Sequence, residues 1–447
     1  MEHVFTKNTT HFNGKFSFLQ EVIEYRLRHE YTSEEAVFPV FDTMVSDDSS
    51  FSQFVNKLDL SQEEIIILLT ALIPHVSPYF FIDIITDFFP NGGELPEFGG
   101  VKGKNHRGII PTGETIQFML AGKDLQKRIE VTSYFEPTHP FVKKGVLRLD
   151  AVPTGEPIMS GRLILDQEYV ELFTTGRMVK PTLSKDFPAE RIETLLSWDD
   201  LVLNTKTLNQ IKEIETWLQY NHVVLDDWKM GTRIKPGYRV LFSGPPGTGK
   251  TLTATLLGKY TGEDVYRIDL SMVVSKYIGE TEKNLSRLFD KAKNKSWILF
   301  FDEADAIFGK RTNVRDAHDK YANQEVSYLL QRIESHPGLV ILASNFKNNI
   351  DVAFTRRFQT IIEFENPSYQ ERQLLWQKNL PAAIALEETV ALEEISKKYA
   401  LTGSNIINII QYTCLKTIAQ NHKAIQLETI LEGIKKEYLK EGKMITI

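Results

Sequence analysis

Cysteine is nearly absent from this sequence: Cys414 is the only one among 447 residues. A single thiol excludes an intramolecular disulfide and a zinc site built from several thiolates. This composition is typical of proteins that fold in a reducing compartment, so we expect a cytoplasmic protein.

An excess of basic residues and a long uninterrupted apolar run are also missing. The chain has 52 Lys and Arg residues against 59 Asp and Glu residues, a formal net charge of −7. This balance disfavours sequence-independent binding to nucleic acid, which requires cations that neutralise phosphates. The first residues lack the apolar core of a signal peptide. The most apolar stretch, residues 65–82, is interrupted by Pro74 and Pro78, which favours two buried helices over a membrane span.

The length of 447 residues is sufficient for about two to three domains. No repeat with a period of roughly 20–50 residues is present. The sequence predicts four segments: a helical region over residues 1–135, a small α+β or winged-helix-like segment with a linker over 136–195, a large α/β subdomain over 196–366, and a helical subdomain over 367–447.

The N-terminal half lacks nucleotide-binding motifs. A helix is predicted over residues 16–28, and another over 61–72 opens with a capping box between Ser61 and Glu64. Residues 141–173 alternate apolar and polar positions between turn signals, as in a small hairpin. Helices followed by a hairpin suit a winged-helix-like module, a fold that binds DNA or docks on proteins. Since no basic recognition helix stands out, we expect an adaptor role.

The C-terminal half alternates short apolar runs with helical segments. Strands are predicted over residues 240–243, 265–270, 297–302, 339–344 and 360–364. This alternation is typical of an α/β fold with a parallel five-stranded sheet and helices on both faces. After Pro367 the pattern becomes wholly helical, which predicts a small helical lid.

A glycine-rich loop lies between the first of these strands and a predicted helix. It comprises Gly244, Pro245, Pro246, Gly247, Thr248, Gly249, Lys250 and Thr251, and the helix continues with Leu252. The glycines allow backbone N–H groups to point at phosphate oxygens, and the helix N-terminus adds partial positive charge. Lys250 can reach the β- and γ-phosphates, and the Thr251 hydroxyl can bind Mg²⁺. The loop predicts a site for ATP and Mg²⁺.

Polar residues follow two of the other predicted strands. Asp302 is placed to hold Mg²⁺ through water, and Glu303 can act as the general base that polarises the attacking water. Asn345 ends another strand. Because ligands bind at the carboxyl ends of strands in such sheets, Asn345 should lie beside Glu303 and orient the water.

Two adjacent arginines, Arg356 and Arg357, precede the last predicted strand. Such a pair is commonly a solvated basic corner. Phosphoryl transfer, however, often needs a guanidinium to neutralise charge that develops on the γ-phosphate. If these side chains project away from their own loop, they can act only on the nucleotide of a neighbouring copy, which implies a ring.

Residues 196–447 resemble a single AAA ATPase module of the AAA+ superfamily, over a little more than half of the chain. The motifs that carry the resemblance are the entry segment Trp198-Asp199-Asp200, the Walker A loop 244–251, the Walker B residues Asp302 and Glu303, the sensor-1-like Asn345, the paired arginine fingers Arg356 and Arg357, and the lid segment Gly403-Ser404-Asn405. The resemblance implies nucleotide contacts from Asp200, Val202, Gly403 and Ser404. It also implies a homo-oligomer, expected to be a hexamer whose assembly can depend on ATP.

The resemblance extends to a lysine–aromatic–x–glycine loop. In members that thread substrates, the aromatic residue projects into the central pore, and Tyr277 with Lys276 occupies this place here. The alternative is that Tyr277 packs on its own helix. A second pore-facing loop is expected over residues 310–316.

The sequence also departs from the family pattern. The acid–glycine–phenylalanine segment that signals between subunits is absent, and Ser335-His336-Pro337-Gly338 stands in its place. The adjacent arginines resemble those of single-ring severing and disassembling members. No His-Glu-x-x-His motif is present, so an unfolded substrate would be handed on rather than cut. More narrowly, the texture around residues 316–323 is similar to bacterial AAA ATPases, some of which are encoded with phage-tail-like contractile injection systems.

Three hypotheses follow for the function. The first is an ATP-hydrolysing ring that remodels, unfolds or disassembles a protein substrate. The second is a nucleotide-switched assembly or accessory factor that docks on a larger particle through its N-terminal half. The third, DNA-dependent motor work, is disfavoured by the acidic charge balance.

Overall fold

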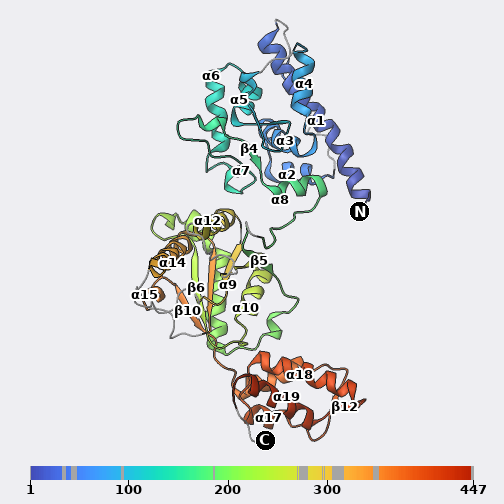
Figure 1. The fold of residues 1–447 in the computed structure, drawn as a ribbon, viewed down its shortest axis with the longest axis vertical. Helices are drawn as coiled ribbons and strands as arrows, with labels where there is room; N and C mark the ends of the chain where they lie inside the picture. Colours follow the sequence, from blue (N-terminus) through green and yellow to red (C-terminus); the bar gives the residue numbers. More distant parts are fainter. Residues whose placement is uncertain are drawn as a thin grey trace. The chain divides into compact units, whose positions relative to one another are not determined.

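The structure is a computed structural model that describes residues 2–32, 37–41, 48–91, 95–184, 187–268, 270, 280–293, 295, 297–304, 317–345 and 352–443. The chain divides into two compact units, Met1–Pro181 and Thr182–Ile447. Both are drawn in Figure 1, and each is described by itself below.

The N-terminal unit is mostly helical. Its helices are α1 (Glu2–Tyr31), α2 (Ser50–Leu58), α3 (Gln62–Val76), α4 (Phe80–Phe88), α5 (Gly113–Ala121), α6 (Leu125–Thr132), α7 (Pro140–Lys143) and α8 (Gln167–Thr175). Two antiparallel pairs of short strands accompany them, β1 (Val101–Lys102) with β2 (Ile109–Ile110), and β3 (Leu147–Leu149) with β4 (Leu163–Leu165). The β3–β4 pair lies where the alternating pattern predicts a hairpin.

Helix α3 forms the centre of this unit. Its residues from Ile65 through Ile73 are all buried, which explains why the sequence is apolar on every side of the helix. The predicted capping box is present, because Ser61 accepts a hydrogen bond from the Glu64 backbone while the Glu64 side chain accepts from Ser61. Among the described residues, no single helix is long and apolar enough to cross a membrane; α3 and α4 pass that test only as a pair, and they are bent by 103°.

The second unit is built on a six-stranded sheet with the order β10-β6-β9-β8-β7-β5. The strands are β5 (Ala189–Ile192), β6 (Tyr238–Ser243), β7 (Asp264–Ile268), β8 (Trp297–Phe301), β9 (Leu339–Ser344) and β10 (Thr360–Glu363). The five strands from β6 to β10 are parallel, as predicted. Strand β8 is buried along its whole length, which explains its continuous apolar sequence.

The prediction misses the sixth strand, β5, which runs antiparallel to β7 at the edge of the sheet. It begins in the stretch for which the sequence predicts a linker. Its outward charges are paired with β7, since Arg191 Nε donates to Asp264 Oδ1 at 2.9 Å and Arg267 Nη2 donates to Glu190 Oε2 at 2.8 Å. A strand of alternating charge is typical of a sheet edge.

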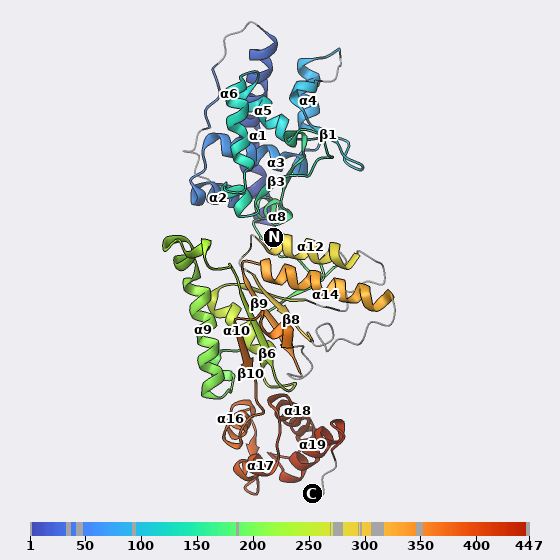
Figure 2. The same ribbon diagram turned by 90° about the vertical axis from the view of Figure 1, so that its left-hand side faces the viewer.

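Helices cover both faces of the sheet, as predicted (Figure 2). Helices α9 (Thr205–His222) and α10 (Lys250–Thr261) pack on one face through a core that includes Ile214 and Leu257. Helices α12 (Glu280–Ala292) and α14 (Ala317–Ser335) pack on the other through a core that includes Phe289 and Leu330. The short α15 (Val352–Thr355) precedes β10.

A helical lid follows β10, again as predicted. It consists of α16 (Tyr369–Asn379), α17 (Leu392–Lys398), α18 (Gly403–Ala419) and α19 (Leu427–Lys440). Ser368 and Glu371 form a capping box at the start of α16, and the lid has its own core around Trp376 and Ile409. A small parallel pair, β11 (Ala385–Leu386) and β12 (Ala424–Ile425), is the one departure from an all-helical lid within the described residues.

Candidate nucleotide-binding and active site

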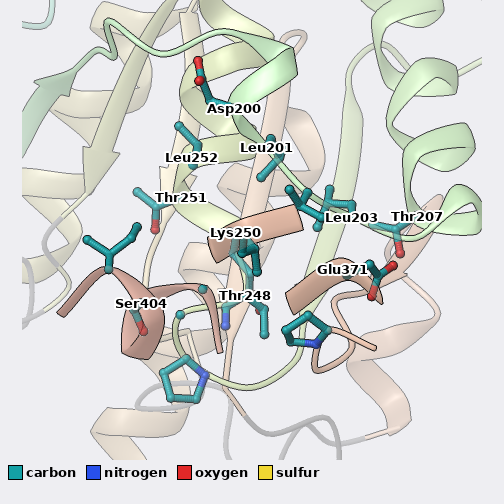
Figure 3. A pocket seen from close by; sticks show the side chains of 18 of the residues that line it. Asp200, Leu201, Leu203, Thr207, Thr248, Lys250, Thr251, Leu252, Glu371 and Ser404 are labelled. Carbon is teal, nitrogen blue, oxygen red and sulfur yellow. The ribbon is translucent and has the colours of Figure 1, made fainter. Parts of the chain in front are cut away.

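A cavity of about 480 Å³ lies between the glycine-rich loop, the segment that enters α9, the ends of β8 and β9, and the lid. This volume is within the range of small-molecule sites. Figure 3 shows Lys250, Thr251, Leu201 and Ser404 around it. The predicted residues that line it are Asp200, Val202, Pro246, Gly247, Thr248, Gly249, Lys250, Thr251, Leu252, Asp302, Glu303, Asn345, Gly403 and Ser404. The structure therefore brings together groups that are more than 200 positions apart in the sequence.

Glycine is required in the loop for two different reasons. At Gly244, with a φ of +150°, a Cβ atom would collide with the carbonyl oxygen of Phe364. At Gly247, with a φ of +75°, a Cβ atom would collide with the hydroxyl of Ser404. The first glycine thus permits close packing against the end of β10, and the second permits the lid to approach the loop.

The Lys250 side chain is buried and fully engaged. Its Nζ donates to the carbonyl oxygens of Gly244 at 2.7 Å and Pro245 at 2.9 Å, and to Asn345 Oδ1 at 3.0 Å. Gly244 and Pro245 do not line the cavity and contribute through these carbonyls instead. Because Lys250 begins α10, its ammonium lies at the positive end of a helix dipole, where an anion is favoured.

The acidic pair follows β8 directly. The carboxylate Oδ1 of Asp302 accepts a hydrogen bond of 3.0 Å from the Glu303 backbone N–H. The next residue, Ala304, donates its N–H to Ala343 O of β9 at 2.8 Å, which holds this turn beside the strand that ends at Ser344. Asn345 therefore lies next to the acidic pair, as expected for neighbouring parallel strands.

Glu303 has a left-handed backbone conformation with a φ of +51°. For a residue that is not glycine this costs on the order of 1 kcal/mol, and such strain occurs often at functional sites. The Glu303 side chain is exposed and lines the cavity. The local strain therefore accompanies a carboxylate that is open to a ligand.

The donor set suits magnesium. The Thr251 hydroxyl and the Asp302 carboxylate both line the cavity, and Mg²⁺ prefers one or two protein oxygens supplemented by water and phosphate. No cluster of three or more His, Cys, Asp or Glu side chains that could hold a metal occurs in the part of the chain that the structure describes. A magnesium ion in this cavity would take its remaining ligands from water and phosphate oxygens.

Asp200 lines the cavity and also stabilises the segment that leads into α9. Its carboxylate accepts hydrogen bonds from the Ser197 backbone N–H at 2.7 Å and the Ser197 hydroxyl at 2.8 Å, which lower the pKa of Asp200. Ser197 and Asp200 form a capping box that shapes the entry segment. Two residues on, Val202 packs against the hydrophobic core of the lid, so the entry segment contacts both subdomains.

The lid contacts the loop through the start of α18. The Ser404 N–H donates to Gly247 O at 3.3 Å, and Thr402 caps the helix through a reciprocal pair of hydrogen bonds with Asn405. This places the N-terminus of a second helix at the cavity. A movement of the lid would therefore break this hydrogen bond to the phosphate-binding loop.

Several lining residues lie outside the sequence prediction. They are Leu196, Leu201, Leu203, Asn204, Thr207, Glu365, Pro367, Glu371, Leu375, Lys378, Asn379 and Ile407. Many of them flank the junction between β10 and the lid, where Thr207 Oγ1 donates to Glu363 O at 3.0 Å. One sequence signal could have indicated these residues. Pro367 and the Ser368–Glu371 capping box mark the junction between two subdomains, where ligand cavities are common.

Arg356 and Arg357 are not part of this cavity. They precede β10, whereas the loop follows β6, and these two parallel strands pair from Thr360 with Val240 to Glu363 with Ser243. The arginines thus lie at the end of the sheet where the parallel strands begin, and the loop lies at the end where they finish. The two are separated by at least about 13 Å along the strands. Both arginine side chains are exposed. This is the placement that the prediction of action on a neighbouring copy requires.

The predicted pore residues Lys276 and Tyr277 lie outside the described residues, as does the second predicted loop, 310–316. Their role stays a prediction from the sequence.

A mostly parallel sheet with a glycine-rich loop after β6, an acidic pair after β8 and a helical lid define a P-loop nucleoside triphosphatase. Residues 240–366 match the family described as "ATPase family associated with various cellular activities (AAA)". The chain therefore contains an AAA ATPase domain, within the AAA+ superfamily that the motifs indicate.

Similar proteins with this domain come from several prokaryotes. A proteasome-activating nucleotidase of Methanosphaerula palustris is 31% identical over 258 residues, which cover 56% of this chain and 60% of that protein. The ATP-dependent zinc metalloprotease FtsH 2 of a Thermoanaerobacter species is 30% identical over 224 residues, which cover 47% and 43%. Protein CdcH of Halobacterium salinarum is 26% identical over 332 residues, which cover 70% and 44%. The chain spans about half the length of the curated relatives that it matches.

Proposed function

We propose that the protein is a Mg²⁺-dependent ATPase that hydrolyses ATP to ADP and phosphate within a homo-oligomeric ring. We further propose that it uses this reaction to remodel, unfold or disassemble a protein substrate. One observation carries the proposal: the Lys250 ammonium joins the phosphate-binding loop to Asn345, in the same cavity as Asp302 and Glu303.

Each group has a defined task in the proposed reaction. Lys250 exchanges its loop carbonyl partners for phosphate oxygens, and the backbone N–H groups of the loop bind the same anion. Thr251 and Asp302 would hold Mg²⁺, which when bound neutralises charge on the phosphates. Asn345 orients the attacking water, and the exposed Glu303 carboxylate accepts its proton.

The positions of Arg356 and Arg357 are evidence for the proposed ring. Phosphoryl transfer is accelerated by a guanidinium that binds the γ-phosphate in the transition state. Arg356 and Arg357 are at the wrong edge of the sheet for their own nucleotide, and both are exposed for contact with another copy. A ring in which each chain completes the site of the next accounts for both facts, and a hexamer is the form that we expect.

The proposal of protein remodelling rests on the similar proteins and on the sequence. One relative is named a proteasome-activating nucleotidase, which indicates action on a protein complex. Tyr277 and Lys276 occupy the place of the residues that grip a threaded chain in related rings. Replacing Tyr277 with Ala should leave ATP hydrolysis within about two-fold of wild type, since the family resemblance assigns this residue to the pore and not to the nucleotide site. Loss of substrate remodelling with retained hydrolysis is the expected result, and unchanged remodelling would contradict threading.

A second function is favoured by the N-terminal unit. Residues 1–181 form a separate compact unit with a core of its own, centred on α3. A unit of this kind can act as an adaptor that docks the ATPase on a larger particle, such as a contractile injection system. In that case the nucleotide serves as a switch for assembly. Specific retention of this particle by residues 1–181 alone would favour this function.

The test of hydrolysis is Glu303→Gln, which keeps the shape of the side chain and removes its basicity. We expect ATP binding close to that of wild type and a fall in turnover of about 100-fold or more, as measured by phosphate release. Survival of turnover would show that Glu303 is not the general base. The matched control is Glu365→Gln, because Glu365 lines the same cavity from the end of β10 and has no assigned catalytic task.

A further inference from the structure

The end of the sheet opposite the cavity, where the parallel strands begin, carries a cluster of cations around one carboxylate. A surface hollow of about 320 Å³ is lined by Lys235, Arg239, Arg356 and Arg357, with Glu334 as its single acid. Four positive charges against one negative charge leave this hollow strongly positive. Such a surface favours an anionic partner.

Arg239 is the internal member of the cluster. It is 5% exposed, and its Nη1 donates to Glu334 O at 3.0 Å and to Pro236 O at 3.2 Å. Its Nε donates to Gln359 Oε1 at 3.1 Å. Since its Nε and Nη1 donate within its own chain, Arg239 holds the last turn of α14 against the start of β6.

Arg357 is restrained by an ion pair. Its Nη1 contacts Glu334 Oε1, and the two side chains are 44% and 34% exposed. Glu334 lies in the last turn of α14, where the helix dipole disfavours a carboxylate unless a cation lies nearby. The adjacent Arg356 is also exposed, but no hydrogen bond or ion pair of its side chain occurs among the described residues. The two arginines are therefore not equivalent.

We propose that Glu334 is an internal counter-ion that holds Arg357 in the separate chain and must release it before Arg357 can bind the triphosphate of a neighbouring copy. Arg356 is then the guanidinium that is available at first contact. This inference rests on the proposed function, because it takes the neighbour's nucleotide as the ligand of Arg357. The exchange is favourable once the chains meet, since a triphosphate offers more charge and more acceptor oxygens than one carboxylate.

The expected effect is modest because the ion pair is partly exposed. Pairs of this kind shift an equilibrium by at most about five-fold. Replacing Glu334 with Gln should therefore lower the protein concentration needed for half-maximal ATPase activity by about two- to five-fold. The maximal activity at saturating protein should stay close to that of wild type.

The experiment measures phosphate release per chain over a range of protein concentrations for wild type, Glu334→Gln and the control Glu213→Gln. Glu213 is an exposed carboxylate on α9 without an ion pair in the described part of the chain. The same shift is measured in an Arg357→Ala background. If Glu334 acts through Arg357, the substitution of Glu334 should have no further effect there, because the restrained group is already gone.

The outcomes separate this inference from the proposed function. Full activity per chain of wild type at concentrations where light scattering shows a monomer would overturn the ring, and this inference with it. Concentration-dependent activity that Glu334→Gln leaves unchanged, or changes equally with and without Arg357, would overturn only the role of Glu334. Binding of a fluorescent ADP analogue should match wild type, because the cavity lies at the other edge of the sheet. Loss of that binding would assign Glu334 to the fold and overturn the inference.

Discussion

Positive charge is arranged differently at the two ends of the parallel strands. We call the end where the strands finish the carboxyl edge and the end where they begin the amino edge. At the carboxyl edge, the Lys250 ammonium is buried and bonded to three oxygens of its own chain. At the amino edge, Arg356 and Arg357 are exposed, and the ion pair with Glu334 is the only one described for either. A buried and bonded cation is organised before its ligand arrives, whereas an exposed guanidinium depends on a partner. In the proposed function, the carboxyl edge binds a nucleotide alone, and the amino edge contributes only when a second copy is present.

The strongest test of this contrast is Lys250→Ala at the carboxyl edge. It removes a cation that would make at least two charge-assisted hydrogen bonds to phosphate, so nucleotide affinity should fall about 100-fold or more. Fluorescence titration with a labelled nucleotide measures the change. Lys206→Ala, at an exposed position of α9, is the control and should bind as wild type does. Near-normal affinity of Lys250→Ala would refute a site complete within one chain.

The double variant Arg356→Ala with Arg357→Ala tests the amino edge. Hydrolysis should fall by roughly 100-fold or more because the transition state loses its guanidinium, while nucleotide affinity of the dilute chain should stay unchanged. Phosphate release and nucleotide titration, measured side by side, give the two results. A parallel loss of affinity would mean that the arginines act within their own chain.

Mixing variants sharpens this test. Lys250→Ala chains retain the arginines but lack a working cavity, and the double arginine variant has the reverse defect. If each site is completed by the neighbouring chain, mixing the two inactive proteins should restore part of the activity. Two inactive proteins that stay inactive when mixed, despite forming joint oligomers, would contradict sharing of the site.

The smallest predicted effect is on the free energy of unfolding and comes from His336, which also lies at the amino edge. His336 is 3% exposed beside the start of β9, and burial together with Arg239 and Arg332 lowers its pKa to about 4. The folded protein keeps this imidazole neutral, while the unfolded chain takes up a proton below about pH 6.5. The free energy of unfolding should therefore decrease as pH falls from about 6.5 towards 4, by roughly 2 kcal/mol at pH 5.

Urea unfolding at pH 7 and pH 5 measures this contribution. His336→Gln removes the titrating group, so the loss of stability between the two pH values should be smaller than in wild type by about that amount. His422→Gln, at an exposed position after α18, is the control and should keep the wild-type dependence. Equal pH dependence in all three proteins would show that His336 takes up its proton without cost.

The sequence was sufficient for those parts of the site whose geometry is set locally. The loop from Gly244 to Thr251 binds through consecutive backbone groups, so its residues and their function are visible in one segment. The proximity of Asp302, Glu303 and Asn345 could be predicted because the carboxyl ends of neighbouring parallel strands lie side by side. The capping box of Ser197 and Asp200 is also local, and its spacing could have been recognised.

Other features depend on contacts that no local pattern specifies. Strand β5 has the sequence Ala-Glu-Arg-Ile, and only its pairing with β7 makes it a strand. Glu334 and Arg357 are 23 positions apart, and they meet because β9 and β10 both flank β6. The residues that line the cavity from the lid, such as Leu375 and Ile407, have the same apolar character as lid core residues. Their exposure to the cavity follows only from the tertiary arrangement.

Strand β5 limits where the two units can be cut apart. Phe187, two residues before β5, is buried, and its ring centroid lies 5.5 Å from that of Tyr266 and 5.9 Å from that of Trp297, edge-on to both. Ala189 is wholly buried against the sheet. A protein shortened to begin at residue 196 would leave the hydrogen-bonding groups of β7 open and two large aromatic rings uncovered. Such an exposed edge promotes aggregation. The residues from Phe187 through β5 therefore act as a covalently attached cover for the sheet of the ATPase domain, and expression of the isolated domain should depend on keeping them.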